Sequence, residues 1–227
     1  TEAPWVHKYN GKYYLTYASE WPEKIAHAMA DKVTGPYEVK GIISEIAGNS
    51  NTTHPAIVNF RDKWVFFSHN GGLPEGTSYS RSMVAEPMEY NPDGTIKKIN
   101  PSTEGMQFKE WSGNPILPGM HADPEILYSE KTGRYYIYST TDGHPGWGGW
   151  YFTCFSSDNL VDWRDEGIIL DVCKDTKWAS GNAWAPAIIE KKVDGQYKYF
   201  FYYSGNAGNA KAIGVAVADS PTGPFVD

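Results

Sequence analysis

The sequence has little cysteine, no block of like charges and no long apolar segment. Its two cysteines, Cys154 and Cys173, have neither a metal-binding nor a redox spacing, and we expect two packed free thiols rather than a disulfide. The net charge of -7 is dispersed along the chain and offers nothing that attracts a phosphate backbone, so we expect no nucleic-acid partner.

Apolar runs are also short. None approaches the roughly 20 residues that a membrane span needs, and residues 1–20 lack the basic and apolar regions of a signal peptide. We therefore expect a soluble protein with no membrane partner. The compartment stays open between bacterial secreted or periplasmic and cytoplasmic.

Aromatic residues, glycine and proline are abundant. Aromatic side chains make up 15% of the chain, and 23 Gly and 15 Pro supply the turns that separate many short strands. Helical periodicity is almost absent. The composition therefore predicts an all-β protein.

One sequence pattern recurs four times. Each copy has a proline near its start, an apolar run, a turn with Gly or Asp, and a strand rich in Tyr, Phe and Trp; the copies are EAPWVHKYNGKYYLTYAS from Glu2, HPAIVNFRDKWVFFSHN from His54, DPEILYSEKTGRYYIYSTT from Asp123 and WAPAIIEKKVDGQYKYFFYYSG from Trp184. A second pair of segments, AMADKVTGPYEV at 28–39 and AVADSPTGPFVD at 216–227, also match each other. Such self-similarity marks a modular architecture.

Repeated units of three or four antiparallel strands predict a β-propeller with about four blades in this chain. A β-sandwich is the alternative, but its strands would not recur in matched blocks. In a propeller the inner strands of all blades begin at one face, so the residues that begin them converge.

Here the inner strands begin near Glu2, His54, Asp123 and Trp184. Taken singly, each has a plain structural explanation: Asp-Pro opens turns, Glu2 is next to the start of the chain, and His54 and Trp184 could be packing residues. Taken together, two carboxylates in an aromatic-walled pocket meet the requirement of glycoside hydrolysis, which needs one carboxylic acid and one carboxylate.

At these residues the sequence resembles glycoside hydrolase family 43, the five-bladed propellers that include β-xylosidases and α-L-arabinofuranosidases. The resemblance rests on PGMHADPEI, WAPAI, TEAPWVHKYNGKYYLTYA and NTTHPAIVNFRDKWVFFSHN, and it extends over nearly the whole chain. It implies an inverting glycosidase that removes terminal xylose or arabinose from (arabino)xylan or arabinan oligosaccharides.

The resemblance also implies roles for single residues. Asp123 would be the general base and Glu2 the general acid, with carboxyl groups about 6.5 to 9.5 Å apart to leave room for the attacking water. His54 would face calcium or a similar cation in the central channel. Because hard cations favour oxygen ligands, one imidazole with waters would hold this ion weakly.

The same resemblance places a further set of residues at the substrate. Arg81 would reach the sugar hydroxyls with its fixed donors, although a surface salt bridge is the alternative. Trp184, Trp147 and Trp5 would form aromatic walls of the sugar pocket.

The chain departs from the family in two ways. Residues 1–108 resemble the fourth and fifth blades, and residues 109–227 the first and second, so the blade order is permuted. The third blade, whose aspartate tunes the acid in the family, has no counterpart. We expect one incomplete or permuted catalytic domain, with a second chain or a swapped copy as a partner that supplies the missing blade.

Two further hypotheses remain open beside the glycosidase. The chain could be a carbohydrate-binding propeller without turnover, or a fragment that becomes active only when the missing blade complements it. An oligosaccharide is the expected ligand in all three cases.

Overall fold

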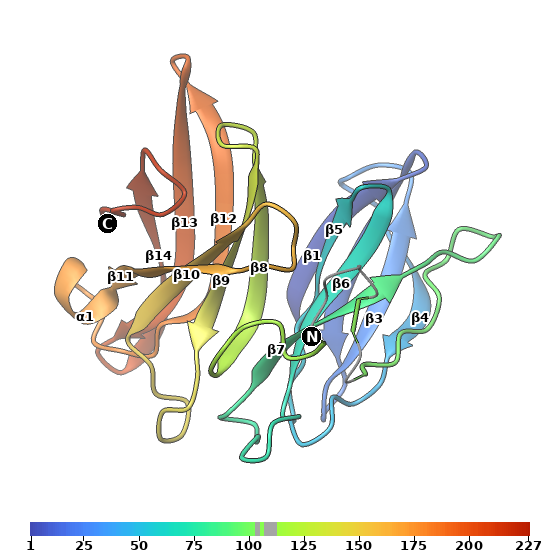
Figure 1. Ribbon diagram of the computed structural model, residues 1–227, viewed down its shortest axis with the longest axis horizontal. Helices are drawn as coiled ribbons and strands as arrows, with labels where there is room; N and C mark the ends of the chain where they lie inside the picture. Colours follow the sequence, from blue (N-terminus) through green and yellow to red (C-terminus); the bar gives the residue numbers. More distant parts are fainter. Residues whose placement is uncertain (103–104, 107–112) are drawn as a thin grey trace. The chain divides into compact units, whose positions relative to one another are not determined.

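The computed structural model describes residues 1–102, 105–106 and 113–227, and they divide into two compact units, Thr1–Gly119 and Met120–Asp227. The sequence-based boundary between residues 108 and 109 lies outside the described residues. Each unit contains two antiparallel sheets (Figure 1).

Unit 1 contains a four-stranded and a three-stranded sheet. Strands β1 (Glu2–Tyr9), β2 (Lys12–Ser19), β3 (Lys24–Ala30) and β4 (Glu38–Ser44) pair in chain order, as do β5 (Ala56–Phe60), β6 (Lys63–Asn70) and β7 (Ser82–Met88). Apolar residues alternate along the strands of the first sheet, so one face of this sheet is buried. The hydrophobic core of unit 1 contains Tyr14, Ile25, Ile43, Ile57 and Phe66. The indole N–H of Trp5 donates to the carbonyl of Ile57 at 3.0 Å and fixes β1 against β5.

Unit 2 has the same plan. Strands β8 (His121–Ser129), β9 (Arg134–Thr141), β10 (Tyr151–Ser157) and β11 (Arg164–Asp171) form one sheet, and β12 (Trp184–Val193), β13 (Gln196–Ala207) and β14 (Ala210–Ala218) form the other. A single turn of helix, α1 (Val172–Asp175), follows β11. The core between the sheets is aromatic, with Tyr138, Phe152, Phe201 and Tyr203 almost fully buried.

The four sheets of three or four strands agree with the four predicted blades. Among the described residues, no helix has the length and apolar character that spanning a bilayer requires. Both cysteines are free, as expected, but only Cys154 is packed. Cys173 lies exposed in α1, which corrects the prediction of two packed thiols.

A bulge interrupts three of the inner strands at the residue before the motif proline. Ala3, Asp123 and Ala185 have φ values of 50°, 52° and 48°, and the ladder register shifts at each of these positions. Such a bulge sets two residues against one on the partner strand and changes where the side chains point. The repeated motif therefore encodes a repeated backbone distortion at the beginning of the inner strand.

Candidate functional site

The predicted acid, Glu2, belongs to a small charged cluster in unit 1. The Nε2 atom of His54 lies 3.8 Å from Oε1 of Glu2 and 3.4 Å from Oε2 of Glu23. Glu23 comes from the turn between β2 and β3, and its Oε2 also accepts the backbone N–H of Thr53 at 2.9 Å. The imidazole thus stands between two carboxyl groups. The Glu2 side chain is 58% accessible to solvent, whereas Glu23 is buried.

The environment of Glu23 favours its neutral form. Burial raises the pKa of the Glu23 carboxyl group most strongly, contact with the Glu2 carboxyl group raises it further, and the bonds from His54 and Thr53 act in the opposite direction. The Glu23 carboxyl group therefore holds its proton to a higher pH than an exposed glutamate does.

The predicted base, Asp123, lies in unit 2 at the bulge of β8 and is 8% exposed. Its Oδ2 accepts a 2.5 Å hydrogen bond from the hydroxyl of Thr140 in β9. That hydroxyl in turn accepts the backbone N–H of Ala185 at 2.8 Å, so Thr140 connects the bulges of β8 and β12. The carboxyl group of Asp123 is thus held by a hydroxyl group from the neighbouring strand of its own sheet, and its role as the base stays a prediction.

Trp184 and Trp147 meet in unit 2. The Trp184 indole N–H donates to the Trp147 carbonyl at 2.7 Å, and the two rings lie 6.4 Å apart at a steep angle. The ammonium group of Lys211 stands 3.1 Å from the centroid of the Trp184 ring, and partial burial lowers the pKa of Lys211 to about 8. The predicted pair of aromatic walls is thus brought together.

Arg81 is 3% exposed, which does not fit the alternative of a surface salt bridge. Its Nη1 donates to the Thr52 hydroxyl at 3.0 Å and lies 3.4 Å from Nε2 of His69. Its role at the substrate stays a prediction. The contacts of Trp5 that are described above join β1 to β5, and its role as an aromatic wall also stays a prediction.

The cation expected beside His54 has suitable donors nearby. The ligand atoms of Glu2, Glu23 and His54 all lie within 4.8 Å of one another, and two carboxylates suit a hard cation. Direct ligation by Glu2 would, however, conflict with its predicted role as a proton donor. An ion at this cluster would therefore have to be held by Glu23 or through water, and calcium stays a prediction.

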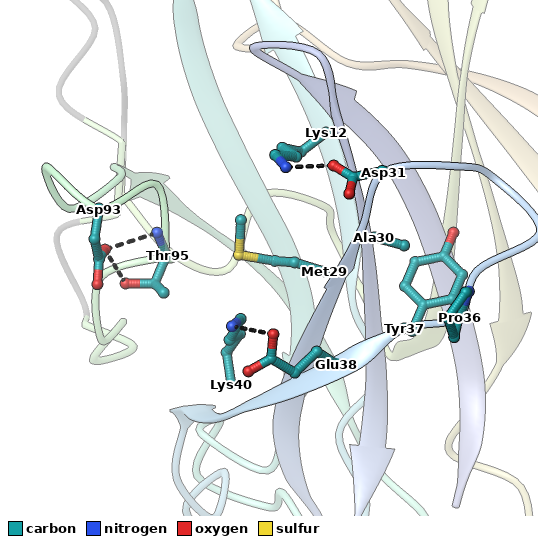
Figure 2. A pocket seen from close by; sticks show the side chains of 10 residues that line it. All are labelled: Lys12, Met29, Ala30, Asp31, Pro36, Tyr37, Glu38, Lys40, Asp93 and Thr95. Carbon is teal, nitrogen blue, oxygen red and sulfur yellow. Dashed lines mark hydrogen bonds and ion pairs between the residues drawn. The ribbon is translucent and has the colours of Figure 1, made fainter.

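Two of the hollows in unit 1 differ in character. One, of about 370 Å³, borders Glu2 and has mainly apolar walls that include Pro4, Leu15 and Val39. The other, of about 680 Å³, is shown in Figure 2. Four of its charged side chains form two ion pairs, Lys12 with Asp31 and Lys40 with Glu38, and Asp93 accepts hydrogen bonds from Thr95. None of the predicted site residues lines the second hollow.

Sequence reasoning missed Glu23, Thr52, His69 and Thr140 as members of these clusters. Thr52 lies two residues before the predicted His54, and Thr140 lies near the end of the tyrosine-rich strand β9, but neither has a local signal that indicates its partner. Glu23 is a carboxylate directly after a turn proline, in SEWPEK, and that pattern usually indicates a solvated turn.

The comparisons with known proteins establish the family of the chain. The family model for glycosyl hydrolases family 43 matches residues 1–96 and 112–227, and the chain therefore belongs to this family. A thermostable family-43 glycoside hydrolase of known structure aligns with 99% of this chain and 70% of its own, with a TM-score of 0.65 at 18% identity. Together with the four antiparallel sheets, this likeness confirms the all-β propeller class.

Two curated relatives are similar over part of the chain. A β-xylosidase of Xylanibacter ruminicola is 37% identical over 99 residues, which are 43% of this chain and 30% of that protein. A xylosidase/arabinosidase of Bacteroides ovatus is 38% identical over 104 residues, 45% of this chain and 31% of that protein. The matched part of this chain spans about a third of the length of either relative.

Proposed function

We propose that this chain belongs to an inverting glycosidase that removes terminal xylose or arabinose residues from (arabino)xylan or arabinan oligosaccharides. One observation carries the proposal: each predicted catalytic carboxyl group lies at the bulged beginning of an inner strand of a family-43 chain, Glu2 in β1 and Asp123 in β8. The names of the curated relatives support xylose and arabinose as the sugars.

In this mechanism Asp123 takes a proton from water, which attacks the anomeric carbon while the bond to the leaving oxygen breaks. Glu2 gives its proton to that oxygen. Thr140 holds the Asp123 carboxylate through its hydroxyl, and His54 contacts the Glu2 carboxyl group. The mechanism requires the two carboxyl groups to stand about 6.5 to 9.5 Å apart.

The test is hydrolysis of aryl β-D-xyloside and aryl α-L-arabinofuranoside by the 227-residue chain, with the anomer of the first product read by NMR. Asp123→Ala and Glu2→Ala should each lower the rate by roughly 100-fold or more, because each removes a proton-transfer group. Glu38→Ala, on the rim of the hollow in Figure 2, is the control and should keep the full rate. Full activity in either catalytic variant would refute the assignment.

A second candidate is a fragment that needs a further β-sheet before it acts, and exposed apolar sheet faces favour it. In unit 2, Ile189, Tyr202, Val215 and Ile213 are 52%, 38%, 43% and 81% exposed on the sheet β12–β14. Mixing this chain with a fragment that carries the family's third blade should then restore hydrolysis. A cation beside His54 is part of either proposal, and metal analysis of the purified protein tests it.

A further inference from the structure

Glu23 joins two loops of unit 1 through both its backbone and its side chain. Its N–H donates to the carbonyl of Asn51 at 2.8 Å, and its Oε2 accepts the N–H of Thr53 at 2.9 Å. The turn between β2 and β3 is therefore fastened to the loop that leads into β5. His54 comes directly after Thr53, so the fastening also places the imidazole.

The imidazole of His54 then reaches from Glu23 to Glu2. Its Nε2 is 3.4 Å from the buried carboxyl group and 3.8 Å from the exposed one. The neighbouring strands are fixed as well, because the Trp5 indole holds β1 to Ile57 in β5. The Glu2 side chain is the solvent-exposed member of this arrangement, with 58% of it accessible, whereas Glu23 is buried.

A proton donor acts well only when its carboxyl group is within hydrogen-bond reach of the leaving oxygen. A solvated glutamate side chain has several rotamers, and each one that points elsewhere lowers the population of the productive geometry. A fixed imidazole beside Glu2 would restrict those rotamers, whereas an unsupported imidazole could turn away.

We propose that Glu23 is a positioning residue for the reaction: it holds the His54 imidazole against the Glu2 carboxyl group and so keeps this proton donor aligned. The inference rests on the proposed function, in which Glu2 is the general acid. The simpler alternative is that Glu23 only fastens the two loops, and the two roles give different kinetics.

The test uses Glu23→Gln, which keeps the shape of the side chain and an oxygen for Thr53. It replaces the carboxyl group beside the His54 imidazole with an amide, which can neither carry a charge nor exchange a proton with the ring. Two aryl glycosides of the same sugar are compared, one with a poor leaving group (phenyl) and one with a very good leaving group (2,4-dinitrophenyl). Only the poor leaving group depends on a proton donor. We expect kcat/KM for the phenyl glycoside to fall roughly tenfold, and that for the dinitrophenyl glycoside to stay within about twofold.

A double-mutant cycle with His54→Gln tests whether Glu23 acts through the imidazole. If it does, adding Glu23→Gln to His54→Gln should cause no further loss on the phenyl glycoside, whereas independent roles would multiply the two losses. The matched control is Glu20→Gln in the same turn, whose exposed carboxylate pairs with Lys24 at 2.9 Å. This control should leave both rates unchanged.

The outcomes separate the inference from the proposed function. Equal losses on both glycosides, or multiplied losses in the cycle, would contradict the positioning role and leave the glycosidase assignment intact. A wild-type chain that hydrolyses neither glycoside would contradict the assignment. Nitrogen NMR of the His54 ring needs no turnover: Nε2 should shift in Glu23→Gln, and an unchanged resonance would show that the contact has no influence on the imidazole.

Discussion

At the scale of single residues, the candidate site depends on side chains whose neighbours are distant in sequence. Asp123 has a positive φ before a proline, a conformation that a residue with a side chain adopts rarely and that costs energy. The hydroxyl of Thr140 stabilises the arrangement because it bonds both the Asp123 carboxylate and the Ala185 N–H of the next bulge. Thr140 thus joins the two distorted strand beginnings of unit 2.

This contact predicts the behaviour of two variants. Thr140→Val keeps the size of the side chain but removes the hydroxyl, so the Asp123 carboxylate loses a donor. Hydrogen bonds to charged groups contribute about 1.5–3 kcal/mol, and we expect hydrolysis of the aryl glycoside to slow by roughly ten- to hundredfold. Thr140→Ser retains the hydroxyl and serves as the control. Equal rates in the Val and Ser variants would show that the bond does not matter for activity.

At the scale of the elements, one buried carboxyl group couples the two sheets of unit 2. Glu125 in β8 accepts the backbone N–H of Ile188 in β12 at 3.1 Å. Burial raises the pKa of Glu125 to about 8, and the bond from Ile188 compensates only in part. Glu125 is therefore protonated in the folded chain at neutral pH.

The raised pKa predicts a loss of stability with rising pH. Between about pH 4.5, where an unfolded glutamate releases its proton, and pH 8, the unfolded chain binds fewer protons than the folded chain, so the free energy of unfolding falls. We expect this fall to be on the order of 2–4 kcal/mol. Glu125→Gln keeps an oxygen for Ile188 and cannot ionise, so it should be more stable than the wild type at pH 8 and similar at pH 4.5.

Urea unfolding of both chains across this pH range measures the effect. Asp158→Asn is the control, because that carboxylate is 74% exposed and pairs with Arg134. The prediction is wrong if the wild type and Glu125→Gln lose stability in parallel.

At the scale of the whole molecule, each unit leaves one apolar sheet face uncovered. In unit 1 a cross-strand row runs from Val6 through Leu15 and Ala28 to Val39, and its outer members are 46% and 64% exposed. In unit 2 the row of Ile189, Phe200 and Val217 lies beside that of Ala187, Tyr202 and Val215. The face of a sheet that contacts water normally carries polar side chains, because polar and apolar residues alternate along each strand. A large apolar patch on such a face marks an interaction surface.

These faces predict that the isolated chain associates with a second copy of itself. Because the central rows of both faces carry no charge, a face of one copy can cover a face of another. Sedimentation velocity should show association that increases with concentration, and Ile189→Lys with Ile213→Lys should weaken it at least about tenfold, since burying a lysine is costly. Val33→Lys changes an exposed apolar residue of a turn and should leave association unchanged. A wild-type chain that stays monomeric at every concentration would rule out this role of the faces.

The local pattern of the sequence was sufficient for much of the fold. Proline-led apolar runs and Tyr-rich partners predicted the paired strands, because period-two alternation and Gly or Asp turns are local properties. The matched segments TGPYEV and TGPFVD predicted related turns, and both follow the third strand of their sheets. The candidate carboxylates Glu2 and Asp123 could be chosen for the same reason, since they stand one or two residues before the motif prolines.

The sequence by itself determined the all-β class, the four sheets, the family and the positions of Glu2, Asp123, His54 and Trp184 at or near the beginnings of inner strands. Only the tertiary structure decided which side chains meet those residues. Glu23 with His54, Thr140 with Asp123, and Glu125 with Ile188 are contacts between different strands or loops. Local propensity and spacing carry no information about such contacts. The contacts form because polar groups that become buried on folding need hydrogen-bond partners, and these partners come from whichever strand packs beside them.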